Sequence, residues 1–206
     1  MGLCCDTIIG DMLKNLIEKT RSIRRFKEDK PVEMGQLRDL ISYARLSASA
    51  ANMQPLKYLI TNTPGVNAKI FLTLGWAGCL ADWPGPIKGE RPAAYIIVLG
   101  DSSISKNFAI DHGISLQSIR LGATSMGLAS CVIVSIKREA LSGTLHIADH
   151  LEILSVVAIG EPVEIVVLEK MKNGDRKYWR DEDGVHHVPK RSLDEIIIRN
   201  GLGSAG

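Results

Sequence analysis

A short basic segment near the N-terminus has the residue types of a phosphate-binding site. Residues 21–26 read RSIRRF and carry three guanidinium groups and one hydroxyl. Arginine offers paired hydrogen-bond donors to a phosphate group, and serine adds one more donor. The segment is equally consistent with a solvated basic turn whose charge is offset by Glu28 and Asp29. On charge alone the solvated turn is the simpler interpretation.

Two side-chain amides, Asn52 and Gln54, stand at alternate positions after a run of small residues. Residues 44–51 read ARLSASAA, and Pro55 prevents a helix from continuing. Amide groups can pair with the donor and acceptor edge of a flat heterocycle, and small neighbours let a ring approach the backbone closely. The alternative is an ordinary helix end with polar capping residues.

A second basic pair, Lys190 and Arg191, stands near the other end of the chain. By itself this pair is typical of a surface turn. A closed domain or a dimer would allow it to meet residues 21–26 at one phosphate group. Together with the amides, the two basic segments indicate one ligand that contains a phosphate, a polar chain and a ring.

Three other patterns resemble known sites but lack the context that those sites need. Residues 201–206 read GLGSAG, but no helix follows to face a pyrophosphate. His146 and His150 are spaced like zinc ligands, yet His150 directly precedes an expected strand. The neighbours His186 and His187 point to opposite faces of an extended segment. We therefore predict no metal site, with a zinc hydrolase built on His146 and His150 as an open alternative.

Alternating helical and strand patterns position these segments. We expect helices over residues 7–20, 31–47, 67–74, 106–126, 137–141 and 193–198, and strands over residues 58–61, 93–99, 131–135 and 151–159. In residues 7–20 the apolar positions follow the helical period, whereas residues 93–99 are rich in Ile and Val. This pattern predicts helices packed on a sheet in one domain, residues 1–206, and charged residues 169–191 resemble an arm.

Composition excludes several classes of protein. A chain of 206 residues suits one domain, and 25 Lys+Arg against 23 Asp+Glu leave a net charge of only +2. Neither this charge nor the few aromatic residues favours nucleic-acid binding. No apolar run approaches the length of a membrane-spanning helix. The four cysteines are one adjacent pair and two distant residues, a spacing that indicates neither a zinc site nor a disulfide framework. We expect a cytoplasmic protein without a membrane or nucleic-acid partner.

Four segments taken together resemble the nitroreductase family of FMN-dependent oxidoreductases. They are residues 21–26, residues 44–55, residues 111–117 (DHGISLQ) and residues 126–131 (MGLASC), and their order and spacing are similar to the family pattern. The resemblance implies an α+β fold in which helices flank a central mixed sheet. It also implies an interlocked homodimer, with FMN at the subunit interface and residues 170–206 forming a C-terminal arm on the partner subunit.

The resemblance further implies roles for individual residues. Arg21 and Ser22 would hold the phosphate and ribityl end of FMN, and Arg24 would lie near the pyrimidine side of the flavin. Thr20 stands where many members carry an additional arginine, which shifts phosphate binding toward the second basic pair. The remaining implied contacts are Ser49, Asn52 and Gln54 from the partner subunit, the Val134 and Ser135 backbone beside N5, and Lys190 and Arg191 at the phosphate.

Flavin chemistry explains why the chain shows no convincing acid, base or nucleophile, because the cofactor itself carries the electrons. We expect hydride to pass from NADH or NADPH to FMN and then to an acceptor such as a nitroaromatic or a quinone, by double displacement. Arg24 is the candidate for stabilising the reduced flavin electrostatically. The alternatives are a flavin-binding sensor or carrier without turnover, and a specialised dehalogenase or desaturase relative.

Overall fold

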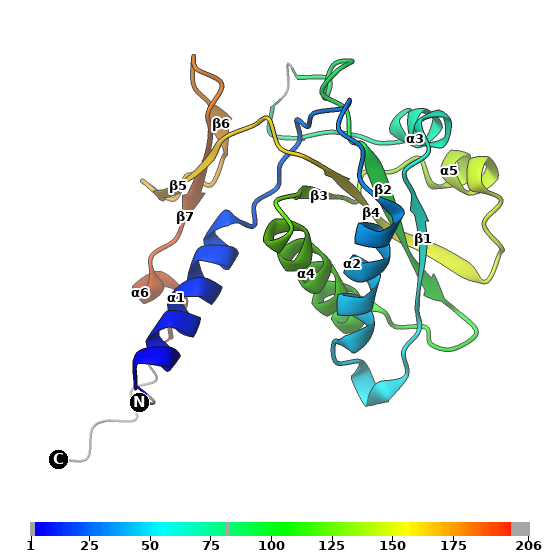
Figure 1. Cartoon of the computed structure of the whole chain (residues 1–206), viewed down its shortest axis with the longest axis horizontal. Coiled ribbons are helices and arrows are strands. Elements are labelled where there is room, and N and C mark those ends of the chain that lie inside the picture. Colours follow the sequence, from blue (N-terminus) through cyan, green and yellow to red (C-terminus); the bar gives the residue numbers. More distant parts are fainter. Residues whose placement is uncertain (1–2, 81–82, 199–206) are drawn as a thin grey trace. The chain divides into compact units, whose positions relative to one another are not determined.

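A four-stranded sheet lies at the centre of the first of two units of the chain. The computed structural model describes residues 3–80 and 83–198, and its units are Met1–Glu164 and Ile165–Gly206. The GLGSAG string, residues 201–206, lies outside the described residues. Figure 1 labels the elements of both units.

The sheet of the first unit is antiparallel throughout. Its strands are β1 (Leu56–Thr61), β2 (Ala94–Asp101), β3 (Ala129–Ile133) and β4 (Leu151–Gly160), in the order β1-β2-β4-β3. Every neighbouring pair runs antiparallel, so the expected mixed sheet was wrong. A parallel neighbour requires a connection that returns the chain to the starting end of the strand. The connection from β3 to β4 contains a helix, but it starts β4 at the same end of the sheet where β3 finishes, so the two strands are antiparallel.

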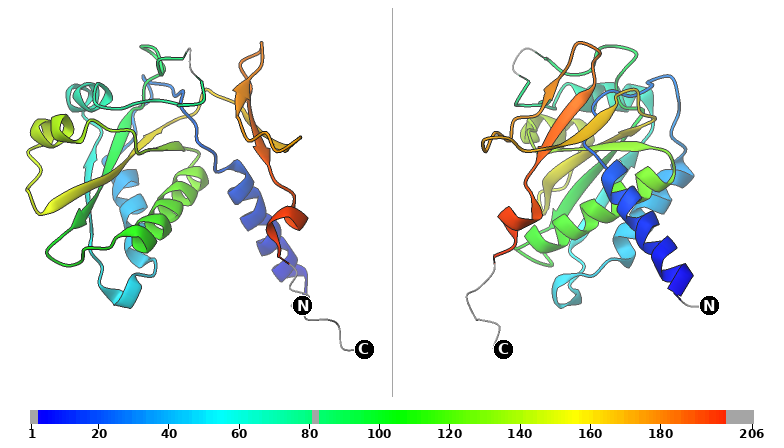
Figure 2. Two further views of the ribbon diagram at one scale, coloured as in Figure 1. Left: turned by 180° about the vertical axis from the view of Figure 1, so that it is seen from behind. Right: turned by 90° about the vertical axis from the view of Figure 1, so that its left-hand side faces the viewer.

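Helices cover both faces of this sheet (Figures 1 and 2). Helices α2 (Met34–Leu46) and α4 (Ala109–Ser125) pack on one face, where Leu40 and Ile119 join Ile96 in the main core. Because side chains alternate along a strand, Tyr95 of β2 faces the other side, toward α3 (Pro64–Phe71). Helix α5 (Arg138–Leu145) buries Leu141. The sheet therefore lies between two helical layers.

Local signals explain where several helices begin. Glu33 and Gln36 form a capping box at the start of α2, and Pro64 occupies the first turn of α3, where its missing N–H costs nothing. Close packing of α2 against α4 depends on Gly122, because a Cβ there would collide with the ring of Tyr43. These features position α2, which leads into residues 49–54, and α4, which begins near Asp111.

Helix α1 (Leu3–Lys19) follows the expected amphipathic pattern, but much of its apolar stripe is uncovered in a single chain. Met12 is 66% exposed and Leu13 is 52% exposed. Among the described residues, none of the helices combines the length and apolar character needed to cross a membrane.

The second unit contains a small three-stranded sheet where no strand was expected. Its strands are β5 (Val166–Lys170), β6 (Trp179–Arg180) and β7 (His186–Lys190), followed by helix α6 (Leu193–Ile196). Strand β7 is central, with β5 parallel and β6 antiparallel to it. Polar contacts rather than apolar burial hold this sheet, which explains why a charged segment forms strands.

Candidate functional site

The basic segment, residues 21–26, lies extended beside strand β3. Ser22 forms a parallel bridge with Ser130, and the Ile23 amide donates to the Ser130 carbonyl oxygen at 3.1 Å. The Arg24 amide donates to Oε2 of Glu164 at 2.8 Å. These backbone contacts fix the segment against the sheet. They place the predicted flavin contacts Arg21, Ser22 and Arg24 at the start of β3.

Val134 and Ser135 follow the other end of the same strand. The Gly75 amide donates to the Ser135 carbonyl oxygen at 2.8 Å, which holds this turn, and Val134 is 60% exposed. A five-residue strand such as β3 spans about 17 Å. An elongated ligand laid along β3 would meet the basic segment at one end and this turn at the other. The predicted contacts Arg21 and Ser22 thus lie at one end of β3, and the predicted contacts Val134 and Ser135 lie at the other.

Unpartnered polar atoms gather near the start of β3. Nε of Arg21, Nε of Arg120 and Oγ of Ser130 are buried and lack a hydrogen-bond partner among the described residues. Nη2 of Arg21 donates to the Ile17 carbonyl oxygen at 2.7 Å. Burial lowers the pKa of both arginines, because the charged form loses hydration. Donors left without partners in such surroundings suit an anionic group such as a phosphate.

The Ser49–Gln54 segment is anchored by Asp111, a residue whose role could not be predicted from the sequence. The Ser49 hydroxyl donates to a carboxylate oxygen of Asp111, and the Ala50 amide donates to Oδ1 of Asp111 at 2.9 Å. The Gln54 amide in turn donates to Oγ of Ser49 at 2.8 Å. Asp111 is 6% exposed and lies in the first turn of α4. An acid in the first turn of a helix is common, so its type alone gave no signal of this contact.

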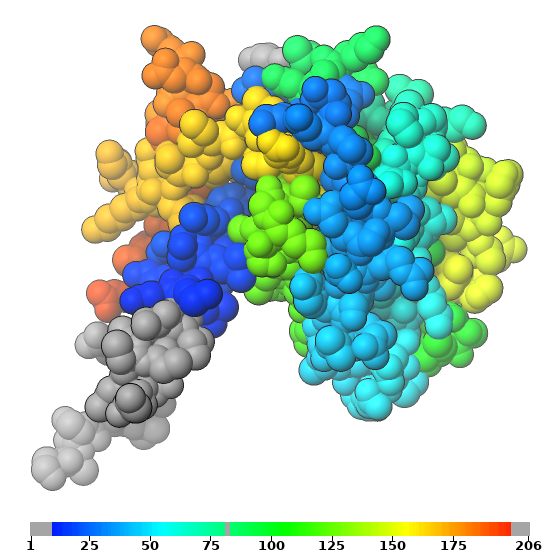
Figure 3. Space-filling model, viewed as in Figure 1, coloured from blue at the N-terminus to red at the C-terminus, as the bar shows by residue number. Residues whose placement is uncertain are grey.

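The anchored segment turns sharply and presents its amides outward. Its residues Ala51, Asn52 and Gln54 have φ values of 49°, 54° and 51°, in the left-handed region. Nε2 of Gln54 donates to Oδ1 of Asn52 at 3.2 Å, and both side chains are exposed. The segment projects at the lower edge of the first unit in Figure 3. Ser49 and Gln54 also line a pocket of about 330 Å³, within the usual range for small ligands.

Helix α4 separates the two groups of predicted contacts within one chain. Asp111 holds Ser49 at the start of this helix, whereas Thr20 donates to Oγ1 of Thr124 near its end, at 2.9 Å. The helix has 17 residues, a length of about 26 Å. A single chain therefore does not bring Ser49, Asn52 and Gln54 to the residues around Arg21.

Lys190 and Arg191 belong to the second unit. Lys190 ends β7, and Nη1 of Arg191 lies 3.6 Å from Oε1 of Glu195 at the start of α6. Both side chains are exposed. Within this unit both are accessible to an anionic ligand.

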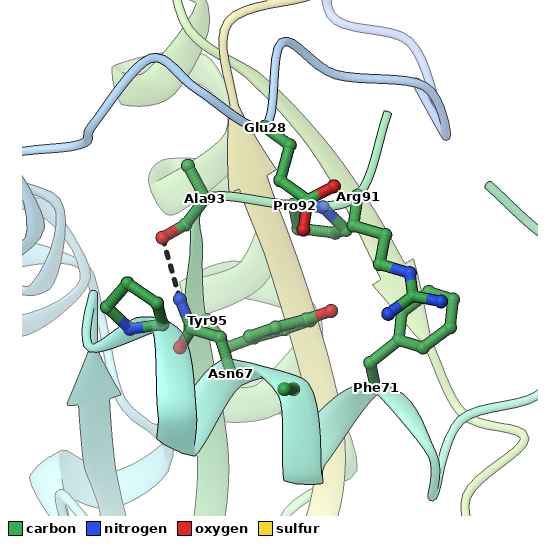
Figure 4. Close-up of a pocket in the computed structure, with 9 residues that line it drawn as sticks. Glu28, Asn67, Phe71, Arg91, Pro92, Ala93 and Tyr95 are labelled. Carbon is green, nitrogen blue, oxygen red and sulfur yellow. Dashed lines mark hydrogen bonds between the residues drawn. The ribbon is translucent and has the colours of Figure 1, made fainter. Parts of the chain in front are cut away.

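A separate small pocket lies between α3 and the sheet (Figure 4). Its labelled residues include Tyr95, Arg91 and Glu28, and the Arg91 guanidinium lies 4.2 Å from the centre of the Phe71 ring. The hydroxyl of Tyr95 and Nε of Arg91 are buried without a hydrogen-bond partner among the described residues. The cavity measures about 70 Å³, which suits a few ordered waters and is too small for a flavin.

The histidine pair of the zinc alternative does not lie on one helix. His146 ends α5 with a left-handed φ of 52°, and His150 directly precedes β4. Within residues 3–80 and 83–198, no group of three or more His, Cys, Asp or Glu side chains is placed to hold a metal ion.

Trp76 packs near Phe71, with ring centres 5.7 Å apart.

Comparison with known proteins decides the family. The model of the nitroreductase family matches residues 17–73 and 80–161. The chain belongs to the nitroreductase family. The matched ranges contain the basic segment, the Ser49–Gln54 segment with its anchor Asp111, and both ends of β3. The second unit lies beyond them.

Solved structures share this nitroreductase fold. A nitroreductase family protein from Streptococcus pneumoniae is 18% identical with a TM-score of 0.65, covering 91% of this chain and 100% of its own. An FMN-dependent nitroreductase from Clostridium difficile is 18% identical with a TM-score of 0.62, covering 90% and 97%. A Parabacteroides distasonis protein, named provisionally as an NADH dehydrogenase/NAD(P)H nitroreductase, is 25% identical with a TM-score of 0.60, covering 78% and 91%.

Proposed function

We propose that the protein is an FMN-dependent oxidoreductase that takes hydride from NADH or NADPH and reduces an acceptor such as a nitroaromatic or a quinone. The observation that carries this proposal is the arrangement along β3, with arginine and serine donors at its start and an exposed turn at its end. Family membership and the names of the Clostridium and Parabacteroides relatives support it.

At the start of β3, Arg21 and Ser22 would hold the phosphate and ribityl end of FMN. Their support is the fixed backbone and the buried, unpartnered Nε of Arg21. Arg24, whose Nη1 donates to the Ser22 carbonyl oxygen at 3.2 Å, would lie beside the pyrimidine ring. A cation there stabilises negative charge that develops on reduction. Lys190 and Arg191 would complete the phosphate site, as the resemblance implies.

At the end of β3, the backbone of Val134 and Ser135 would lie beside N5. When bound, FMN supplies the atom N5, which accepts hydride from the nicotinamide and later passes the hydride to the acceptor. The contact from Gly75 keeps this turn in place, and the exposure of Val134 leaves room for a substrate. The same open space would admit nicotinamide and acceptor in turn, which gives double-displacement kinetics.

The functional unit in this proposal is a homodimer. Ser49, Asn52 and Gln54 of one chain would reach the flavin held by the other, because their anchor Asp111 lies about 20 Å along α4 from Thr124, which holds their own basic segment. The uncovered apolar stripe of α1, with Met12 and Leu13, supports an interface between chains. Residues 170–206 would form the arm on the partner subunit. A cytoplasmic location and the lack of a nucleic-acid partner stay predictions from composition.

Steady-state oxidation of NADH or NADPH, followed at several concentrations of a quinone or a nitroaromatic, tests this proposal. Parallel lines in double-reciprocal plots are expected, because the two substrates use one site in succession. A protein that binds FMN but leaves nicotinamide unoxidised would instead be a flavin sensor or carrier. Product analysis would distinguish a specialised dehalogenase or desaturase.

A further inference from the structure

Arg120 lies in α4, on the side that meets the basic segment. Thr124, one helical turn further along, accepts a hydrogen bond from Thr20, the residue before Arg21. Oγ1 of Thr124 also donates to the Arg120 carbonyl oxygen at 3.0 Å. This chain of contacts brings Arg120 close to Arg21. The two guanidinium groups interact electrostatically, and each carries the same charge.

Among the described residues, no salt bridge to an acid joins either of these two cations. Arg120 makes no ion pair there, and its Nε is buried without a hydrogen-bond partner, like that of Arg21. Glu18, which attracts Arg21, is exposed on α1. Cys131 also lies within electrostatic reach, but burial raises the pKa of its thiol, so the thiol stays neutral. Two partly buried like charges with unmet donors are unfavourable unless an anion lies between them.

Ser130 adds a third unmet donor on the same side of the sheet. It pairs with Ile159, which faces α4 in the core, so the Ser130 side chain also points to the α4 face. Its Oγ is buried and has no hydrogen-bond partner among the described residues. Ser22 bridges to Ser130 at this point, which places all three donors beside the predicted phosphate contacts.

We propose that Arg120 binds the phosphate group of FMN, together with Arg21 and Ser130. This inference rests on the proposed function, and it adds one residue on α4 to the site. A phosphate dianion satisfies the open donors and removes the repulsion between the two guanidinium groups. Arg120 thereby makes the site selective for FMN over riboflavin, which has the same ring and ribityl chain but no phosphate.

The proposal separates cofactor binding from stability. A structural arginine stabilises the empty protein, so removing it lowers the Tm. Arg120 faces another cation in the empty protein, so replacing it with an apolar residue should leave the Tm unchanged or raise it. The replacement should weaken only the binding of a flavin that carries the phosphate group.

The test is a titration of the flavin-free protein with FMN and, separately, with riboflavin. The proteins compared are wild type, Arg120→Leu, Arg120→Lys and Arg38→Leu, the last replacing an exposed arginine of α2 as a control. We expect Arg120→Leu to raise the Kd of FMN about ten- to a hundredfold and to leave the Kd of riboflavin unchanged. Arg120→Lys should lose less affinity because it keeps the charge, and Arg38→Leu should match wild type.

Equal FMN affinity in wild type and Arg120→Leu would overturn the inference while leaving the proposed function intact. Equal weakening of FMN and riboflavin, or a lower Tm of the flavin-free Arg120→Leu protein, would also overturn it, since either result indicates a structural role. Wild-type protein that binds neither flavin would contradict the proposed function itself.

Discussion

Thr20 and Thr124 are joined by a hydrogen bond between their side-chain oxygens, 2.9 Å apart. This bond ties the basic segment to the C-terminal end of α4, whereas Asp111 ties the Ser49–Gln54 segment to the N-terminal end. One helix thus sets the separation between two groups of predicted flavin contacts. In the proposed homodimer, a second chain would supply one of these groups to each flavin.

Replacing Arg24 with alanine should slow reduction of bound FMN by NADH or NADPH about tenfold, equivalent to about 1.4 kcal/mol. The reason is the loss of a positive charge beside the pyrimidine ring, where reduction places negative charge. Rapid-mixing absorbance under anaerobic conditions measures the rate. Arg24→Lys should retain most of it, and the exposed Arg38→Ala variant serves as a control. Unchanged reduction of a fully loaded Arg24→Ala protein would contradict the role.

Asp111→Asn should destabilise the protein by about 2 kcal/mol, or roughly 4–8 °C in Tm. The substitution replaces a carboxylate oxygen that accepts from Ser49 or Ala50 with a group that only donates. Thermal unfolding followed by circular dichroism provides the measurement. Asp39→Asn changes an exposed acid on α2 and should leave the Tm unaltered. Equal Tm values for the two variants would show that Asp111 does not anchor the segment.

Gly75→Ala should lower the affinity for FMN about tenfold, because the turn at Val134 and Ser135, which is proposed to lie beside N5, would have to move. An added Cβ at position 75 would lie 2.5 Å from Oγ and 3.1 Å from Cβ of Ser135. Ser135→Gly removes both atoms, so the double variant should recover most of the affinity. Gly78→Ala is the matched control, since no heavy atom lies within 4 Å of its new Cβ. Failure of Ser135→Gly to restore binding would sink this explanation.

His187 should titrate above its ordinary value and stabilise the small sheet of the second unit. Its Nε2 and Nδ1 lie 2.9 Å and 2.5 Å from carboxylate oxygens of Asp181 and Glu169, so both ring nitrogens must donate. The hydrogen bond to Asp181 raises the pKa of His187, and Glu169 adds to the effect. Trp179 stacks on the imidazole with ring centres 4.0 Å apart.

The sign of the pH dependence follows from the two partners. The His187 contribution is complete below about pH 6.5 and is lost as pH rises through its raised pKa. The same hydrogen bond lowers the pKa of Asp181, whose contribution is present above about pH 4 and is lost on acidification. NMR titration of the His187 ring protons checks this, with His187→Gln to assign the signal. A midpoint at or below 6.5 would rule out the charged arrangement.

Periodic elements of the first unit could be predicted from sequence because apolar spacing alone determines them. Strands β2 and β4 and helices α2 and α4 lie close to their expected ranges. Helix α3 begins at Pro64, earlier than expected, and a proline in the first turn was the available signal. The antiparallel order could not be predicted, since strand direction depends on how each connection packs. Polar contacts around His187 hold the second sheet, and they leave no apolar pattern.

The candidate site could be proposed from the sequence only where several chemical groups cluster along the chain. The RSIRRF segment does lie against β3, as a shared site with Val134 and Ser135 requires. Asp111 and Arg120 were missed, because one charged residue in a long helix carries no spacing signal. Their importance appears only when Ser49 and Thr20 are brought against α4 by the fold.

The most direct test of the proposed oxidoreductase activity is the visible spectrum of the purified protein with FMN, recorded without oxygen before and after addition of NADH or NADPH. We expect a yellow protein with about one FMN per chain. Its flavin bands should bleach with the nicotinamide and return when a quinone or a nitroaromatic is added. A colourless protein that takes up no added FMN would contradict it.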